Sequence, residues 1–115
     1  MRTRVIAVDA QGSVLFGGTA GARRLPGMGA GFVTDLSLRV QPDQVLRVSE
    51  LECVAGARLL ARREGILAGA STGAVVHAVV SLLPQRPDDA RIAMVVHDGG
   101  MPYLDTIYDL SLIHI

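Results

Sequence analysis

Short apolar runs alternate along this chain with segments of helical periodicity, and this alternation is the feature that most limits its fold. Residues 5–9, 44–48 and 91–96 are brief runs rich in aliphatic and β-branched side chains, which is typical of strands in a parallel sheet. The residues between the second and third runs predict two helices, at about 50–63 and 71–83. We therefore expect an α/β fold, with a partial, open and mostly parallel sheet flanked by helices.

The first predicted helix has a defined start and a defined end. Ser49-Glu50-Leu51-Glu52 is a capping box, in which Ser49 and Glu52 each bond the other's backbone N–H. Gly65 is a suitable C-terminal cap. Cys53, the only cysteine, lies inside this helix and is expected to be a small buried apolar filler. The expected apolar stripe consists of Leu51, Val54, Ala55 and Leu59.

Composition restricts the classes of function. The 115 residues are enough for about one domain, and eleven cationic residues balance eleven acidic ones. The charge balance predicts neither a nucleic-acid partner nor a polybasic membrane patch. All the cationic residues are arginine, so no side chain can form a Schiff base with a carbonyl cofactor. A single cysteine cannot make an internal disulfide, which fits a cytoplasmic location.

One stretch is long enough to be weighed as a membrane span. Residues 65–85 carry no formal charge, but they include three glycines, a histidine and a proline. The first part reads as a turn, which leaves only a short apolar helix. We therefore expect a core helix and no membrane partner.

The string Gly69-Ala70-Ser71-Thr72-Gly73 fits G-x-S-x-G and allows three interpretations of Ser71. It is a nucleophile, a contact to a ligand at a helix start, or only a helix cap. The nucleophile is disfavoured because His77 lies within the predicted helix and suits a satisfied core histidine better than a catalytic base. A neutral serine hydroxyl at a positive helix end can donate to a heteroaromatic nitrogen, which should then stay unprotonated.

Two further strings are candidate ligand contacts. Gly27-Met28-Gly29-Ala30-Gly31 lies in a long glycine-rich loop at residues 17–31, but its spacing does not fit a dinucleotide-binding loop. His97-Asp98 follows the third predicted strand, at the sheet edge where ligands bind in open α/β folds. A metal site is not expected, because no further ligands follow at suitable spacing.

Taken in order, four strings resemble one family. VIAVDAQGSVLFG, LPGMGAG, EGILAGASTGA and the Asp98–Tyr108 pattern D-x-G-x-x-Y-L-D-T-x-Y are similar to fold-type II pyridoxal-phosphate enzymes of the cysteine synthase group. The resemblance is closest to the branch that makes N-(2-amino-2-carboxyethyl)-L-glutamate for 2,3-diaminopropionate. It implies part of the large domain of the tryptophan synthase β-like fold over residues 1–109. Residues 110–115 do not match and are expected to be a separate, non-native tail.

The resemblance also implies roles for individual residues. Ser71 would hydrogen-bond the pyridine nitrogen of pyridoxal 5'-phosphate, with Gly69, His97 and Asp98 beside the ring. The glycine loop, Gly27, Met28, Gly29, Ala30 and Gly31, would line the substrate entrance. Family enzymes replace a leaving group on a serine derivative, such as O-phosphoserine or O-acetylserine, by an amine or thiol nucleophile. The implied partners are a small amino-acid substrate and a second copy of the enzyme, as a homodimer.

The same resemblance implies that important parts lie outside these residues. The family's cofactor-binding lysine, the loop that grips the substrate carboxylate and the phosphate loop all belong upstream of Met1. We therefore expect no catalytic residue in this chain, which looks like the C-terminal third of an enzyme and should be inactive alone. The alternative is a non-catalytic α/β module that binds a ligand or partner through its glycine loop.

Overall fold

The computed structural model describes residues 2–25 and 27–110. Its strands are β1 (Ile6–Ala10) and β2 (Gln44–Val48), and its α-helices are α1 (Asp35–Arg39), α2 (Glu50–Glu64) and α3 (Ala70–Leu82). Short 3₁₀ turns follow at Leu83–Gln85 and Met101–Tyr103. Of the tail expected at 110–115, residues 111–115 lie outside the described residues.

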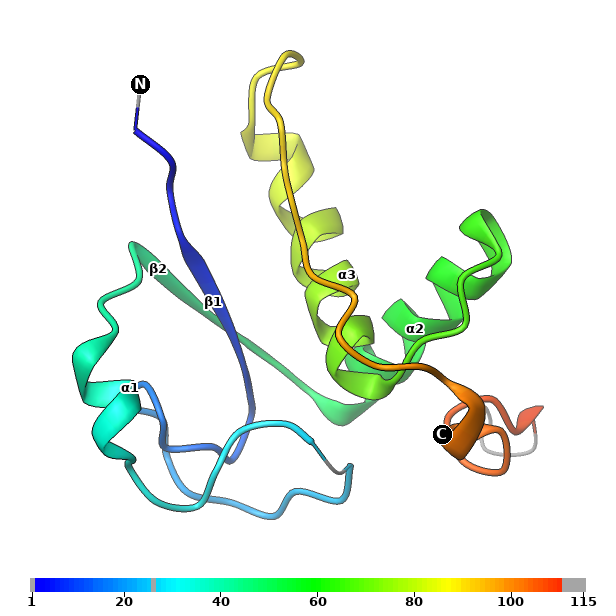
Figure 1. The fold of residues 1–115 in the computed structure, drawn as a ribbon, viewed down its shortest axis with the longest axis horizontal. Helices are drawn as coiled ribbons and strands as arrows, with labels where there is room; N and C mark the ends of the chain where they lie inside the picture. Colours follow the sequence, from blue (N-terminus) through cyan, green and yellow to red (C-terminus); the bar gives the residue numbers. More distant parts are fainter. Residues whose placement is uncertain (1, 26, 111–115) are drawn as a thin grey trace.

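The strands β1 and β2 form a parallel pair, as the sequence predicts. Ile6 pairs with Gln44 and Ala10 with Val48, and the pairing continues as the Gln11 amide donates to the Val48 carbonyl at 2.9 Å. Figure 1 shows this pair beside α3 and α2, with α1 on the long connection between the strands. The α/β architecture with flanking helices is therefore confirmed.

Residues 91–96 do not form the buried third strand that their apolar sequence predicts. In the described part of the chain they are extended but pair with no strand, and Val95 is 71% exposed. A strand needs a neighbour to satisfy its backbone donors and acceptors, and β1 and β2 pair only with each other. The segment instead runs along α3 in the view of Figure 1 and leads into His97 and Asp98.

The predicted limits of α2 agree with the structure to within one residue, but its predicted apolar stripe is only partly buried, with Val54 packed on the core and Ala55 exposed. The Ser49–Glu52 capping box is present, and Gly65 caps the helix with φ of 69°. The buried residues are Cys53, Gly56 and Ala57, whereas Leu51 is 52% exposed. The small residues face α3 because the two helices approach too closely there for larger side chains.

The close approach of α2 and α3 rests on two glycines. A Cβ on Gly56 would meet the Gly73 carbonyl oxygen, and one on Gly73 would meet the Cys53 carbonyl oxygen, each at less than 3.0 Å. This crossing packs Cys53, Ala57 and Ala74 into one core with Val48 and Ile107. The glycines therefore fix how α3 is placed against the rest of the chain.

A polar pair supports the same helix crossing at its edge. His77 on α3 lies with Nε2 2.8 Å from a Glu52 carboxylate oxygen, while Glu52 also closes the capping box. The expected satisfied histidine is therefore confirmed, although its side chain is 35% exposed and not in the core.

Acidic pH is expected to lower the stability of the folded chain through protonation of Glu52. The bond donated by the Ser49 backbone amide is the largest cause that lowers the pKa of Glu52, with help from the Ser49 hydroxyl and His77. A lowered pKa in the folded chain means that this stabilisation is present above the ordinary value of 4.5 and is lost as pH falls through the folded value.

Urea melts between pH 3 and pH 6, as an order-of-magnitude window, would test this. Glu52→Gln should flatten the acid side of the stability profile relative to the unchanged chain. Glu64→Gln, at the exposed end of the same helix, is the matched control. An equal flattening by both variants would contradict the role of Glu52.

Candidate functional site

The N-terminus of α3 is capped by a residue from a distant segment. Gly69 is the N-cap and offers no side chain, and the Asp98 carboxylate accepts from the Gly69 amide at 3.2 Å. A Cβ on Gly69 would lie less than 3.0 Å from Asp98. The helix begins at Ala70, one residue before the predicted start, and Asp98, not Ser71, binds the amide of its N-cap.

Ser71 is the second residue of α3, and its hydroxyl makes a contact that the sequence did not suggest. Ser71 Oγ lies 2.5 Å from His97 Nε2, and His97 Nδ1 lies 3.2 Å from the Val95 carbonyl oxygen. The structure thus brings Gly69, Ser71, His97 and Asp98 together, four residues that the sequence analysis proposed as neighbours. The first turn of α3 contains no acidic residue, but the Asp98 carboxylate at the Gly69 amide partly offsets the positive end of the helix.

The segment after His97 closes over the same region. The Tyr108 hydroxyl donates to the Ala68 carbonyl and accepts from the Ala68 amide. Burial raises the pKa of Tyr108, which keeps the phenol protonated as a donor. Arg58 on α2 fixes the end of this segment, because its guanidinium donates hydrogen bonds to the carbonyls of Ile107 and Asp109.

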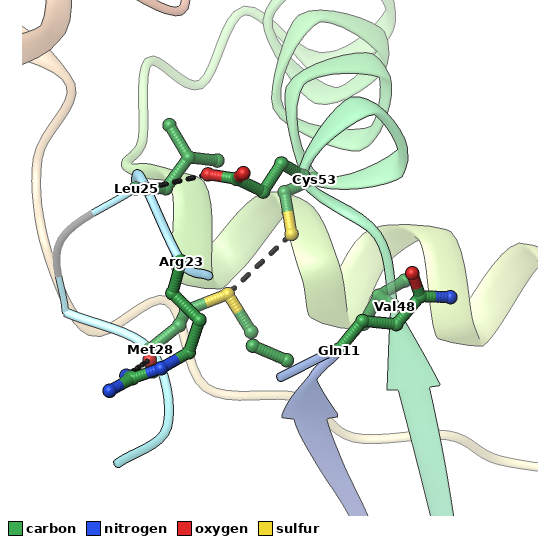
Figure 2. Close-up of a pocket in the computed structure, with 8 residues that line it drawn as sticks. Gln11, Arg23, Leu25, Met28, Val48 and Cys53 are labelled. Atoms are coloured by element: carbon green, nitrogen blue, oxygen red, sulfur yellow. Dashed lines mark hydrogen bonds between the residues drawn. The ribbon is translucent and has the colours of Figure 1, made fainter. Parts of the chain in front are cut away.

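The glycine loop is held in a different place, against β1 and α2. The Ala30 amide donates to Ser13 Oγ at 3.1 Å, and Arg23 donates to the Met28 carbonyl at 2.8 Å. Figure 2 shows Met28 turned inward, with its sulfur 3.5 Å from that of Cys53. Among the described residues, hydrogen bonds join residues 24–30 to Ser13, in the turn after β1, and to Glu50 of α2, and not to Ser71 or His97.

The cavity in Figure 2 is too small for a cofactor. It is lined by Ala10, Gln11, Arg23, Leu25, Met28, Val48, Glu50 and Cys53. Its volume of about 10 Å³ is close to the space of one water molecule. Burial raises the pKa of the Cys53 thiol to about 11, so Cys53 is a structural residue here, as the sequence predicts.

Sequence reasoning missed the residues that hold these parts in place. Glu50 accepts from the Arg24 and Leu25 amides at 2.7 Å each, which ties the glycine loop to the start of α2. Asp9, although 2% exposed, is the fourth residue of β1 and accepts from the Ala10 amide. A charged residue that interrupts a buried run was the available signal for Asp9, and Tyr108 ends the Asp98–Tyr108 pattern quoted above. Nothing local marks the contacts of Glu50 or Arg58.

The arrangement can bind a polar ring edge, but it has no covalent anchor for a carbonyl cofactor. A neutral hydroxyl and an imidazole face the positive end of a helix, which suits hydrogen bonding to a heterocycle. The chain contains no lysine in any of its 115 residues.

Comparison with known proteins decides the family. Residues 1–98 match the family described as pyridoxal-phosphate dependent enzyme. This chain belongs to that family. Its members depend on pyridoxal phosphate, so the cofactor implied by the sequence is the family's cofactor.

Two relatives of this chain are synthases. The chain is 48% identical over 106 residues to N-(2-amino-2-carboxyethyl)-L-glutamate synthase of Ralstonia nicotianae and 45% identical over 109 residues to the same enzyme of Cupriavidus metallidurans. Each match covers 92% of this chain but only 31% and 32% of the relative. The chain therefore spans about a third of these relatives.

Solved structures give the same fold. The O-acetylserine dependent cystathionine beta-synthase from Helicobacter pylori matches with a TM-score of 0.79 and 28% identity, covering 90% of this chain and 34% of that one. O-ureido-L-serine synthase matches with a TM-score of 0.80 and 28% identity, covering 93% and 34%. The expected cysteine synthase-like fold is confirmed. No helix in residues 2–25 and 27–110 is long and apolar enough to cross a membrane.

Proposed function

We propose that this chain supplies the pyridine edge of a pyridoxal-phosphate site in a β-replacement enzyme that acts on a serine derivative. The observation that carries the proposal is the junction of Ser71, His97 and Asp98 at the start of α3, in a chain of this family. The nucleophile would be an amine or a thiol. Identity of 48% to N-(2-amino-2-carboxyethyl)-L-glutamate synthase favours the amine of an amino acid.

The residues present fit one edge of the cofactor. Ser71 would lie at the ring nitrogen, with Gly69 beside the ring and the Asp98 carboxylate holding the helix end through the Gly69 amide. When bound, pyridoxal phosphate withdraws electrons from the substrate's α-carbon and so permits loss and replacement of the β-substituent. The lysine and the phosphate contacts would come from residues outside these 115, and Gly27 to Gly31 would line the substrate entrance.

The test is a hybrid enzyme. The matched region of the Ralstonia nicotianae synthase is replaced by residues 1–109 of this chain, and product formation from O-phosphoserine or O-acetylserine is measured with glutamate or a thiol. We expect turnover by the hybrid and none by this chain alone. Ser71→Ala should lower kcat/KM of the hybrid about tenfold, which corresponds to one hydrogen bond of about 1.4 kcal/mol.

The matched control is Ser81→Ala, because Ser81 lies at the other end of α3 and bonds the Ala78 carbonyl. It should leave kcat/KM unchanged. A folded hybrid that binds pyridoxal phosphate but replaces no leaving group would contradict the proposed reaction. Turnover by the 115-residue chain alone would contradict the inference that these residues form only part of the active site.

One contact favours a second candidate, a serine nucleophile. Ser71 and His97 have the spacing of a nucleophile and its base. A catalytic triad would also need a carboxylate on His97. However, His97 Nδ1 faces the Val95 carbonyl, and the Asp98 carboxylate accepts from the Gly69 amide. An acyl-ester probe that labels Ser71, and not Ser81, would favour this candidate over the cofactor site.

A further inference from the structure

The donor and acceptor roles in the hydrogen bonds of His97 decide whether the Ser71 hydroxyl can donate or accept a hydrogen bond towards a ligand. The imidazole lies between two neighbours, the Val95 carbonyl on Nδ1 at 3.2 Å and the Ser71 hydroxyl on Nε2 at 2.5 Å. Val95 belongs to the extended segment that precedes His97, and Ser71 belongs to α3. The ring therefore connects two parts of the chain through both of its nitrogens.

The Val95 carbonyl fixes which nitrogen carries the proton. A carbonyl oxygen only accepts hydrogen bonds, so Nδ1 must be the donor. In a neutral imidazole, Nε2 then holds a lone pair and accepts. The Ser71 hydroxyl has a single proton, and in this arrangement it donates that proton to Nε2. Only the oxygen lone pairs of Ser71 remain for anything bound at the start of α3.

We propose that His97 is a positioning residue that sets whether the Ser71 hydroxyl donates or accepts a hydrogen bond towards a ligand. With neutral His97, Ser71 accepts, and it suits a ligand that carries a proton on nitrogen. With doubly protonated His97, Nε2–H donates to Ser71 Oγ, and the hydroxyl proton is free to donate to an unprotonated nitrogen. If the ligand is a pyridine ring, an assumption that rests on the function proposed above, the protonation state of the ring nitrogen is coupled to that of His97.

The charged surroundings of this pair are few within the described residues. Asp98 follows His97 in the chain, and its carboxylate accepts from the Gly69 amide. The Tyr108 hydroxyl bonds the backbone of Ala68, the residue before Gly69. The first turn of α3 adds no acidic side chain.

The test reads the imidazole nitrogens directly, without cofactor. The full 115-residue chain is labelled with ¹⁵N, and long-range ¹H–¹⁵N spectra distinguish protonated from lone-pair ring nitrogens above the titration of the histidines. We expect His97 in the Nδ1–H form. His77 provides the opposite reference in the same spectrum, because its Nε2 faces the Glu52 carboxylate at 2.8 Å and should carry the proton. His97→Gln identifies the signal by removing it.

The variants separate positioning from general structure. Ser71→Ala removes the hydroxyl on Nε2 but leaves the Val95 carbonyl on Nδ1, so His97 should keep the Nδ1–H form while its Nε2 resonance shifts with the loss of the hydrogen bond. Ser71→Thr keeps the hydroxyl and should restore the Nε2 resonance. Amide exchange at Gly73 checks in each sample that α3 is folded.

An Nε2–H form in the unchanged chain, or an Nε2 resonance unaffected by Ser71→Ala, would overturn the proposal. An unfolded α3 would overturn it too, because Ser71 and His97 would not meet. A hybrid enzyme without β-replacement activity would refute the function proposed above and leave the tautomer result standing.

Discussion

Replacing Gly73 by alanine is expected to lower the free energy of unfolding by about 2–3 kcal/mol. Alanine in a helix interior should gain about 1 kcal/mol over glycine in propensity. That gain is outweighed, because the added Cβ would lie under 3.0 Å from the Cys53 carbonyl and the Ala57 amide. These are backbone atoms, so α2 and α3 must move apart. The loss is measured as a fall in the midpoint of a urea melt with unchanged slope.

Gly99→Ala is the matched control for this prediction. A Cβ on Gly99 meets nothing within 4 Å, so this variant should unfold within about 0.5 kcal/mol of the unchanged chain. Gly56→Ala should behave like Gly73→Ala, since it enters the same crossing from the other helix. Equal stability of Gly73→Ala and Gly99→Ala would show that α2 and α3 do not cross at this distance.

Replacing Ile107 by alanine is expected to cost about 2–5 kcal/mol, the usual range for a buried aliphatic side chain. Ile107 is 1% exposed and lies in the core cluster with Cys53 and Ala57 on α2. The Arg58 guanidinium donates to its carbonyl at 2.6 Å, so the side chain and backbone of Ile107 both hold the last described segment to α2. The fall in stability is again read from a urea melt.

Leu104→Ala in the same segment is the control, because Leu104 is 45% exposed. Its cost should stay near 0.5 kcal/mol, as for other surface positions. If Ile107→Ala and Leu104→Ala were equally mild, the segment that carries Tyr108 would not be docked. The closure of the site around Ala68 would then have no support.

Several local features could be predicted from sequence because their causes are local. The capping box at Ser49 and Glu52, and the cap at Gly65, depend on residues within one turn of the helix. The strand at 44–48 was predicted with its observed bounds, and the first strand was displaced by one residue. The short helix α1 was missed because it is five residues long and buries no side chain.

Features that depend on distant partners were predicted less well. The apolar run at 91–96 has the composition of a strand, but strand pairing depends on a neighbour that composition does not supply. The stripe of α2 was assigned to Leu51, Val54, Ala55 and Leu59, whereas Gly56 and Ala57 face α3 because of the close crossing. The site residues Ser71, Gly69, His97 and Asp98 were named from the family resemblance, and their roles towards the cofactor stay predictions.

The sequence by itself determined the α/β class, the caps of α2 and the family, because local hydrogen bonds, periodicity and short motifs depend on residues that are close together in the sequence. Only the tertiary structure decided that Asp98 caps α3 in place of Ser71. It also decided that Ser71 meets His97, and that Tyr108 and Arg58 close the last segment over the site. Each of these contacts joins residues more than twenty positions apart, so their geometry follows from how the helices cross and not from any local pattern.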